Sequence, residues 1–257
     1  MTACVKDFIF KVAVTSRCNF RCTYCRPCNS SNEMSDKALK RVLKSAAEVG
    51  LQKLNWTGGE PTIRPNIIEI VKYAQSLGFL SQSMTTNGSI LYRMAKRLHN
   101  AGLYRIVVSI DTLNHKKFHE ITGVNKLHAV KKSIMTALEY FDNVGMNVVV
   151  DRNNQNTVGE IIEFAQECKG GEKLRIKFLE MVSQNNSFLK NFGSSDITYE
   201  NRFVPAKEII KYMSENGELI GGIVGPENSE IRYITYRYKI AGKNGDYLES
   251  VYRVNIL

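Results

Sequence analysis

Apolar runs and amphipathic stretches alternate along the first two thirds of the chain. Short runs rich in Val, Ile and Phe are typical of buried strands, whereas apolar residues that recur every three or four positions are typical of helices. This pattern predicts strands at residues 8–14, 51–56, 79–85, 103–110, 146–150 and 174–179. It predicts helices between them at residues 35–49, 65–77, 90–101, 126–143 and 158–168. The strands and helices therefore follow one another in regular order.

Strands that alternate with helices of this length are typical of parallel sheets joined by right-handed crossovers. Six such units fit into residues 8–181, fewer than the eight of a closed (β/α)8 barrel. We therefore predict an α/β fold, an open partial (β/α)6 barrel, for a first domain at residues 1–182.

The pattern changes after this domain. Residues 183–199 are polar and predict a loop, and residues 205–216 predict one more helix. Two runs of alternating polarity, at residues 231–240 and 247–256, are joined by a turn rich in Gly and Asn, which predicts a β-hairpin. We predict that residues 183–257 form a C-terminal extension that packs on the barrel.

Composition narrows the class of protein. The 257 residues are 43% hydrophobic, enough to bury one large core. The net charge of +10 favours anionic partners such as phosphorylated small molecules, an acidic protein or nucleic acid. Because the sequence lacks a basic tail and an aromatic–basic RNA-binding pattern, a nucleic-acid partner is not expected.

Neither a targeting signal nor a membrane span is expected. Residues 1–7 are polar and lack the apolar core of a signal peptide. No run approaches the roughly 20 apolar residues of a transmembrane helix. We expect a soluble cytoplasmic protein without a membrane partner, whose thiols stay reduced and available to metals.

A cysteine-rich loop follows the first strand, with Cys18, Cys22 and Cys25 in a C-x3-C-x2-C spacing. A structural zinc site is disfavoured because no second Cys or His pair follows, and a disulfide framework is disfavoured because the cysteines crowd in one loop. Three thiolates can ligate three irons of a [4Fe-4S] cluster, which leaves the fourth iron open. The alternative is that Cys28 is a fourth ligand and closes the cluster.

Small and polar residues follow the next three predicted strands. Gly58 and Gly59 allow close approach to the backbone, and Glu60 offers a carboxylate to a cationic amine. Thr85 and Asn87 follow the third strand, and residues 108–112 end the fourth. Because the carboxyl ends of parallel strands form the active face of α/β barrels, we expect these residues to lie at one site.

The cysteine loop and the Gly58-Gly59-Glu60-Pro61 sequence together resemble the radical SAM superfamily. The resemblance implies one [4Fe-4S] cluster held by Cys18, Cys22 and Cys25, with S-adenosylmethionine (SAM) bound to the open iron. It further implies that the following residues bind SAM: Tyr24, Gly58, Gly59, Glu60, Thr85, Asn87, Ser109 and Met181.

Over residues 8–182 the chain is similar in particular to the GTP 3′,8-cyclase family of molybdenum-cofactor biosynthesis, including an element at residues 118–123. That family has a second cluster on three C-terminal cysteines, whereas no cysteine follows Cys168 here, so we expect one cluster only. Two family arginines that contact the triphosphate are replaced by Asn55 and Lys177, while Lys53 is retained. These three residues are the predicted substrate-binding residues.

The resemblance also implies a reaction. One electron from a reduced flavodoxin or ferredoxin would cleave SAM, and the resulting 5′-deoxyadenosyl radical would abstract hydrogen from a small anionic substrate: a nucleotide, a nucleoside or a phosphorylated sugar. Without a second cluster, we expect a redox-neutral rearrangement, cyclisation, elimination or epimerisation. Cys28 and Cys168 are candidate hydrogen donors to a substrate radical.

Three alternatives stay open. One is a divergent cyclase of purine nucleotides, and another is a radical SAM enzyme that modifies a peptide or an antibiotic precursor. The third is a non-enzymatic iron–sulfur or zinc protein that binds nucleic acid through its positive charge.

Overall fold

The computed structural model describes residues 5, 8–25, 33–181, 199–205, 207–209, 211, 218–219, 232–241 and 247–256. The chain is organised in two compact units. The first unit comprises Met1–Arg21, Pro27–Ser109 and Lys126–Val144, and the second comprises Cys22–Arg26, Ile110–Asn125 and Gly145–Leu257. The predicted domain boundary at residue 182 stays a prediction.

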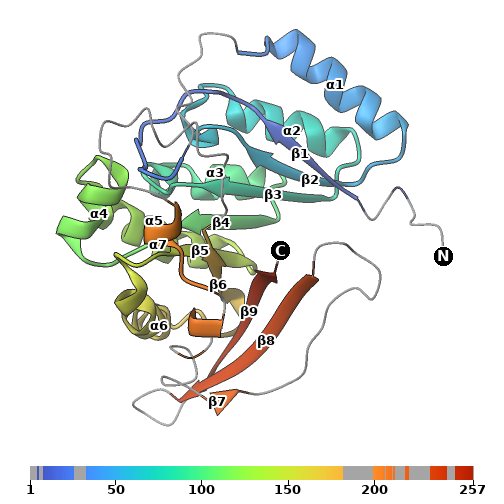
Figure 1. Cartoon of the computed structure of the whole chain (residues 1–257). Helices are drawn as coiled ribbons and strands as arrows, with labels where there is room; N and C mark the ends of the chain where they lie inside the picture. Colours follow the sequence, from blue (N-terminus) through green and yellow to red (C-terminus); the bar gives the residue numbers. More distant parts are fainter. Residues whose placement is uncertain are drawn as a thin grey trace. The chain divides into compact units, whose positions relative to one another are not determined.

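The six predicted strands are all present and belong to one six-stranded sheet with the order β1-β2-β3-β4-β5-β6 (Figure 1). The register from β1 to β4 is parallel throughout. The strands are β1 (Ile9–Ala13), β2 (Lys53–Thr57), β3 (Ser81–Thr86), β4 (Arg105–Ser109), β5 (Val144–Val150) and β6 (Leu174–Glu180). The α/β prediction with alternating strands and helices is therefore confirmed.

The helices also follow the predicted order. The Ser35 hydroxyl accepts a hydrogen bond from the Ala38 amide and caps α1. The prediction of a single helix at residues 90–101 is wrong. A 3-10 turn, Leu91–Arg93, comes first, and Met94, whose φ of −134° is not helical, separates this turn from α3. The helices are α1 (Asp36–Glu48), α2 (Ile67–Ser76), α3 (Ala95–Asn100), α4 (His115–Thr122), α5 (Leu127–Tyr140), α6 (Val158–Glu167) and α7 (Tyr199–Arg202).

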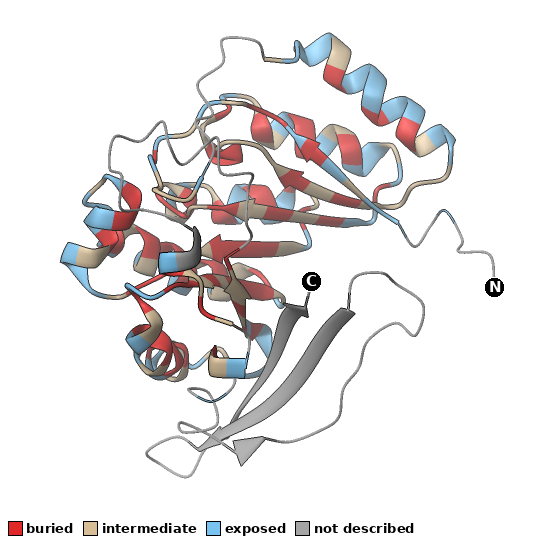
Figure 2. Cartoon of the chain, viewed as in Figure 1, coloured by how far each residue is buried: buried red, intermediate tan, exposed pale blue. Residues whose placement is uncertain are grey.

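The sheet of the first unit has two different faces. Leu54, Trp56 and Met84 point to the side covered by helices and are fully buried. Asn55 and Ser83 alternate with them and are only partly buried (Figure 2). Because successive side chains of a strand point to opposite faces, the sequence places an apolar core on one side and polar groups on the other.

The C-terminal hairpin prediction is confirmed. β8 (Arg232–Ala241) pairs with β9 (Tyr247–Ile256) in an antiparallel register, and a short strand, β7 (Glu218–Leu219), pairs with β8. The predicted loop at residues 183–199 and most of the helix predicted at residues 205–216 lie outside the described residues. Among the helices that the structure describes, none is long and apolar enough to cross a membrane.

The core of the first unit contains a buried polar link. The indole Nε1 of Trp56 donates to Gln82 Oε1 (3.0 Å), and Gln82 Nε2 donates to the carbonyl oxygen of Val71 in α2 (3.2 Å). Both Trp56 and Gln82 are fully buried. The link joins β2, β3 and α2, and no water can replace a lost partner there.

We predict that Gln82→Met lowers the free energy of unfolding by about 1–3 kcal/mol, because it leaves the Trp56 N–H buried without a partner and removes the second hydrogen bond to the Val71 carbonyl. Urea unfolding followed by the fluorescence of Trp56, the only tryptophan, measures the change. Gln166→Met, at a half-buried position in α6, is the control. An equal, small effect of both substitutions would contradict the prediction.

Candidate active site

In the first unit, the turn after β2 packs directly on the backbone that leads into the cysteine loop. The Gly59 amide donates to the carbonyl oxygen of Thr15 (2.7 Å), and the Glu60 amide donates to that of Arg17 (2.8 Å). A Cβ atom would lie 2.3 Å from the Thr15 oxygen at Gly58 and 2.0 Å from the Arg17 oxygen at Gly59. The close packing of the protein's own backbone therefore requires both glycines. The sequence interpretation had attributed them only to the approach of a ligand.

Glu60 is buried and joins this turn to the end of β3. Its Oε1 accepts hydrogen bonds from the Thr62 amide (3.0 Å) and the Thr86 hydroxyl (2.5 Å), and its Oε2 accepts one from the Asn87 amide (2.6 Å). Removal from water raises the pKa of this carboxyl, and the hydrogen bonds oppose the rise. Because a carboxylate oxygen can accept two hydrogen bonds, Oε2 keeps capacity for a further donor such as an amine.

Asn87 connects the same turn with the first cysteine. Its Nδ2 donates to Asn19 Oδ1 (2.8 Å) and lies 3.8 Å from the Cys18 sulfur. The Phe20 amide also donates to this sulfur (3.4 Å). N–H groups directed at a thiolate stabilise its negative charge and favour its role as a metal ligand.

Arg64 binds the backbone on both sides of the cysteine loop. It is buried, and its guanidinium donates to the carbonyl oxygens of Val14 and Met34 (3.2 Å for Met34) and pairs with Asp36 at the start of α1. One side chain thus joins the end of β1, the segment after the cysteine loop and a helix N-terminus. Arg64 thereby holds the backbone at Val14, before the cysteine loop, and at Met34, after it.

In the second unit, the segment Cys22–Arg26 is held by several hydrogen bonds. The Tyr24 hydroxyl donates to Asp111 Oδ2 (2.5 Å), and the Thr23 amide donates to the Ile121 carbonyl oxygen at the end of α4 (2.9 Å). Removal from water, followed by the negative charge of Asp111, holds the pKa of Tyr24 well above its usual range. Burial also raises the pKa of Asp111, to about 6. The Tyr24 side chain, predicted to contact SAM, is therefore already hydrogen-bonded to the end of β4.

The predicted substrate residues of the first unit lie on the polar face of its sheet. The parallel registers place Lys11, Asn55, Ser83 and Arg105 side by side across β1 to β4, and Lys53 lies two positions before Asn55 on the same face. The Oδ1 atom of Asn55 is buried and has no hydrogen-bond partner among the described residues. Because buried acceptors are normally hydrogen-bonded, this atom can accept a hydrogen bond from a water or from a ligand.

The remaining predicted residues occupy separate positions. Thr85 and Ser109 are half-buried at the ends of β3 and β4 in the first unit. In the second unit, Met181 follows β6 and is buried, and Lys177 is half-buried in β6. Cys168 is half-buried, forms no disulfide and occupies the C-cap position of α6. Cys28 lies outside the described residues.

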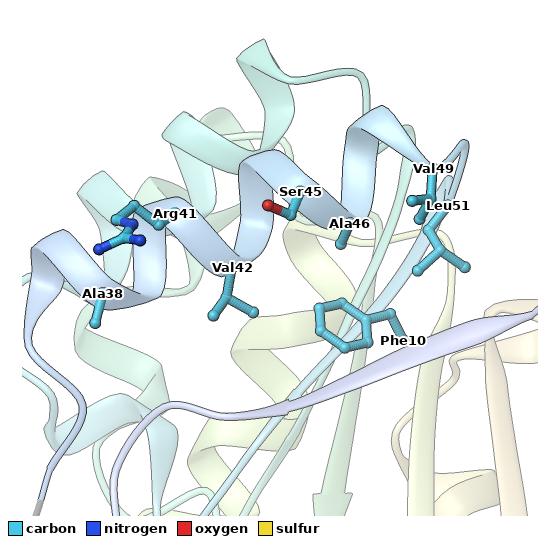
Figure 3. Close-up of a pocket in the computed structure, with 8 residues that line it drawn as sticks. All are labelled: Phe10, Ala38, Arg41, Val42, Ser45, Ala46, Val49 and Leu51. Atoms are coloured by element: carbon cyan, nitrogen blue, oxygen red, sulfur yellow. The ribbon is translucent and has the colours of Figure 1, made fainter.

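A separate groove lies between α1 and β1 in the first unit, with a volume of about 590 Å³ (Figure 3). It is mostly apolar, and none of the predicted site residues lines it. Its walls are formed by Phe10, Ala38, Arg41, Val42, Ser45, Ala46, Val49 and Leu51.

Comparison with known families identifies the superfamily of the chain. The model of the family described as "Radical SAM superfamily" matches residues 12–165, which contain the cysteine loop, the Gly58-Gly59 turn and the end of β4. The chain belongs to the radical SAM superfamily. This superfamily consists of enzymes whose cofactors are a [4Fe-4S] cluster and SAM, so the enzyme and cofactor predictions are confirmed.

Curated relatives agree with this assignment. A protein named "Probable GTP 3′,8-cyclase" from Pyrococcus abyssi is 34% identical over 186 residues, which are 71% of this chain and 60% of the relative. "Molybdenum cofactor biosynthesis protein moc-5" of Caenorhabditis elegans is 32% identical over 246 residues, 92% of this chain and 38% of that protein. The chain thus spans about 60% of the length of its archaeal relatives.

Solved structures show the same fold. The structure titled "Crystal structure of Streptococcus suis SuiB bound to S-adenosylmethionine" has a TM-score of 0.63 at 20% identity, covering 80% of this chain and 47% of SuiB. "Native anSMEcpe with bound AdoMet and Cp18Cys peptide" has a TM-score of 0.61 at 19% identity, covering 80% of this chain and 58% of that one. The partial-barrel prediction is confirmed by these neighbours of the radical SAM fold.

The residues present fit a [4Fe-4S] cluster with an open iron. Cys18, Cys22 and Cys25 form no disulfide, and Cys25 is exposed. Among the described residues, no three metal-binding side chains are placed to hold a single ion. A [4Fe-4S] cluster does not need this convergence because each thiolate ligates a different iron. Three thiols in one short loop are therefore better suited to the cluster than to zinc.

Asp151 and Arg202 were not foreseen from the sequence. Asp151 accepts a hydrogen bond from the Asn153 amide, and the one available signal for it was its position at the carboxyl end of a predicted strand. Asp111 and Thr86 lie in the polar segments expected at the site, but their hydrogen bonds to Val149 and Glu60 were not foreseen. Nothing local to residues 199–202 indicated that Arg202 reaches the cysteine loop.

We predict that Gly59→Ala destabilises the protein by about 1–3 kcal/mol or more, because the added Cβ collides with the Arg17 carbonyl and displaces the entrance to the cysteine loop. Thermal unfolding measures this loss. Gly78→Ala is the control, since its Cβ meets no atom within 4 Å and only the positive φ of +92° is unfavourable. Equal losses in the two variants would show that the close approach at Gly59 is not important.

We predict that Asp111 makes the folded protein less stable as pH rises from about 4 to about 6. Its pKa is about 6 in the folded protein and 3.8 for an unperturbed carboxyl, so the folded state binds the proton more tightly and loses this advantage as the pH rises. In the wild type, this effect lowers the free energy of unfolding by up to about 3 kcal/mol over this pH range, and Asp111→Asn should abolish that decrease.

Urea unfolding of the metal-free protein at pH 4, 5, 6 and 7 tests the prediction. Glu172→Gln, at an exposed carboxylate, is the control. If the free energies of unfolding of wild type and Asp111→Asn run parallel over this range, the raised pKa of Asp111 is wrong.

Proposed function

We propose that this radical SAM enzyme holds its cluster on Cys18, Cys22 and Cys25 and acts on a small anionic substrate, with a nucleotide as the first candidate. The observation that carries the proposal is the match of the superfamily model to residues 12–165, a segment that contains all three cysteines. The relative named "Probable GTP 3′,8-cyclase" supports the nucleotide.

The residues of the first unit would bind SAM through its polar end. The free acceptor capacity of Glu60 suits the amine of the methionyl group, and the tight Gly58–Gly59 turn leaves no side chain between that amine and the backbone. Asn87 would orient the Cys18 thiolate through its amide. Thr85 and Ser109 in the first unit, and Tyr24 and Met181 in the second, would also contact SAM.

When bound, the cluster and SAM supply a carbon-centred radical that can abstract hydrogen from a substrate. The chain's own residues would orient the substrate against it and exclude water. We expect the reaction to be redox-neutral, with Cys168 and Cys28 as candidate hydrogen donors to a substrate radical.

The polar face of the first unit supports an anionic substrate. Lys11, Lys53 and Arg105 supply positive charge, and the unsatisfied Oδ1 of Asn55 can accept a hydrogen bond from a base or sugar. On β6 of the second unit, Lys177 would add a further cation. A phosphorylated nucleoside contains both an anion and donors for such an acceptor.

The electron would come from an acidic donor such as a flavodoxin or ferredoxin. Residues 70–110 and 121–138 contain no Asp or Glu and eight Lys or Arg residues. On this surface, the ammonium of Lys132 and the guanidinium of Arg93 lie 4.9 Å and 5.3 Å from the centre of the Tyr92 ring. Because of this positive charge, an acidic protein would be attracted to this part of the first unit. Tyr92 follows shortly after Asn87, which contacts Cys18.

Anaerobic reconstitution tests the cluster and the cofactor chemistry. We expect about four irons per chain, a change in the EPR spectrum of the reduced cluster on addition of SAM, and formation of 5′-deoxyadenosine under dithionite. Cys22→Ala should abolish SAM cleavage because only two ligands remain, whereas Cys168→Ala should retain it. Bound zinc and no SAM cleavage in the wild type would refute the proposal.

The substrate is found by deuterium transfer. Candidate nucleotides, nucleosides and sugar phosphates, deuterated on the ribose or sugar, are incubated with enzyme and SAM, and 5′-deoxyadenosine is analysed by mass spectrometry. Asn55→Leu should raise the KM of the true substrate at least about tenfold, since a buried polar contact is lost. Transfer only from peptides would replace the nucleotide proposal.

A further inference from the structure

A buried ion pair of the second unit reaches the cysteine loop from far along the chain. Arg202, the last residue of α7, pairs with Asp151, the residue that follows β5, with Nε to Oδ2 at 2.9 Å. Arg202 is 7% exposed and Asp151 3% exposed. The Nη1 group of Arg202 donates to the hydroxyl oxygen of Thr23 at 3.1 Å, across 179 positions of sequence.

We propose that Arg202 and Asp151 are positioning residues for the cluster, acting through Thr23 between Cys22 and Tyr24. The inference rests on the proposed function, because it assumes that Cys22 and Cys25 are cluster ligands. It makes α7 a part of the cluster site, which neither the superfamily match to residues 12–165 nor the position of α7 in the sequence indicates.

The pair is rigid enough to hold the loop. Asp151 Oδ1 accepts from the amides of Asn153 (2.8 Å) and Asn154 (3.2 Å), while Oδ2 receives the guanidinium. The backbones join as well, since the Arg152 amide donates to the Arg202 carbonyl oxygen (2.9 Å) and Asp151 forms a β-bridge with Phe203. A buried ion pair with its other lone pairs satisfied has one geometry, because any rotation would leave a charge without a partner.

The neighbouring contacts show what this geometry fixes. Thr23 is held at its amide by the Ile121 carbonyl and at its hydroxyl by Arg202, and Tyr24 is held by Asp111. The Nδ2 group of Asn154 donates to the Asp111 carbonyl oxygen (2.8 Å), so the supports after β4 and β5 are joined. Thr23 is thus attached to α4 and α7, and Tyr24 to the residue Asp111 that follows β4. Figure 1 shows α7 beside β5.

Such support matters for a cluster. Groups behind the ligands orient them, and their loss typically weakens metal binding by roughly 10- to 100-fold. Arg202 can only donate, so it occupies a lone pair of the Thr23 oxygen and leaves the hydroxyl proton for another acceptor. Hydrogen bonds and the position of the loop both affect the reduction potential of an iron–sulfur cluster.

The test uses the full-length chain with reconstituted cluster. Thr23→Val removes the acceptor and keeps the shape, Thr23→Ser keeps the hydroxyl, and the double variant Asp151→Asn/Arg202→Met removes both buried charges together. The matched control is Arg152→Met/Glu208→Gln, which removes a more exposed ion pair (2.8 Å) between the same two segments. Thr136→Val in α5 controls for loss of a hydroxyl elsewhere.

We measure the rate of iron loss to a chelator, the midpoint potential of the cluster and the SAM-induced change in its EPR spectrum, together with the melting temperature of the metal-free protein. We expect Thr23→Val and the Asp151/Arg202 double variant to lose iron about tenfold faster and to shift the potential. Thr23→Ser and both controls should behave as the wild type. Restoration by Ser and not by Val separates positioning from a general loss of stability.

Two failures are distinguishable. If the wild type takes up no [4Fe-4S] cluster, the proposed function is wrong. If the wild type takes up the cluster and Thr23→Val matches Thr23→Ser in iron loss, potential and spectrum, Arg202 does not position the cluster and this inference is overturned.

Discussion

The contact between the Gly58–Gly59 turn and the backbone at Thr15 to Arg17 is the constraint on which the site of the first unit depends. Two amide-to-carbonyl hydrogen bonds hold the segments together, and no side chain fits between them. The segment continues directly into Cys18, so its path determines where the first thiol lies. Glu60 and Arg64, on the same turn, extend this support to the end of β3 and the start of α1.

Buried carboxylates recur at the ends of strands. Glu60 follows β2, Asp111 follows β4 and Asp151 follows β5, and each receives at least one hydrogen bond from a backbone amide. Burying a carboxylate is unfavourable unless such donors replace water. The amide donors to Glu60 and Asp151 come from the loops after β2, β3 and β5, whereas the donor to Asp111 is the Val149 amide within β5. Satisfying these charges therefore orders the loops and ties one strand end to the next strand. The charges thereby organise the edge of the sheet at which parallel α/β proteins place their chemistry.

The polar face of the first unit follows from the same geometry. Alternation along a strand places Lys53 and Asn55 together, opposite the core residues Leu54 and Trp56. Parallel registers then bring residues of four strands into one row, and helices cover only the apolar side. This division of the sheet connects the fold with the proposed anionic substrate.

The sequence alone determined the strand and helix order, the three-thiol loop and the Gly58–Glu60 turn, because periodicity, capping and spacing are properties of neighbouring residues. It failed at residues 90–101, where the break at Met94 leaves no strong local signal. Only the tertiary structure decided that Glu60 binds Thr86, that Lys11 stands beside Asn55, and that Arg202 reaches Thr23. These contacts join segments distant in sequence, and their geometry depends on how the strands and loops pack, which no local pattern specifies.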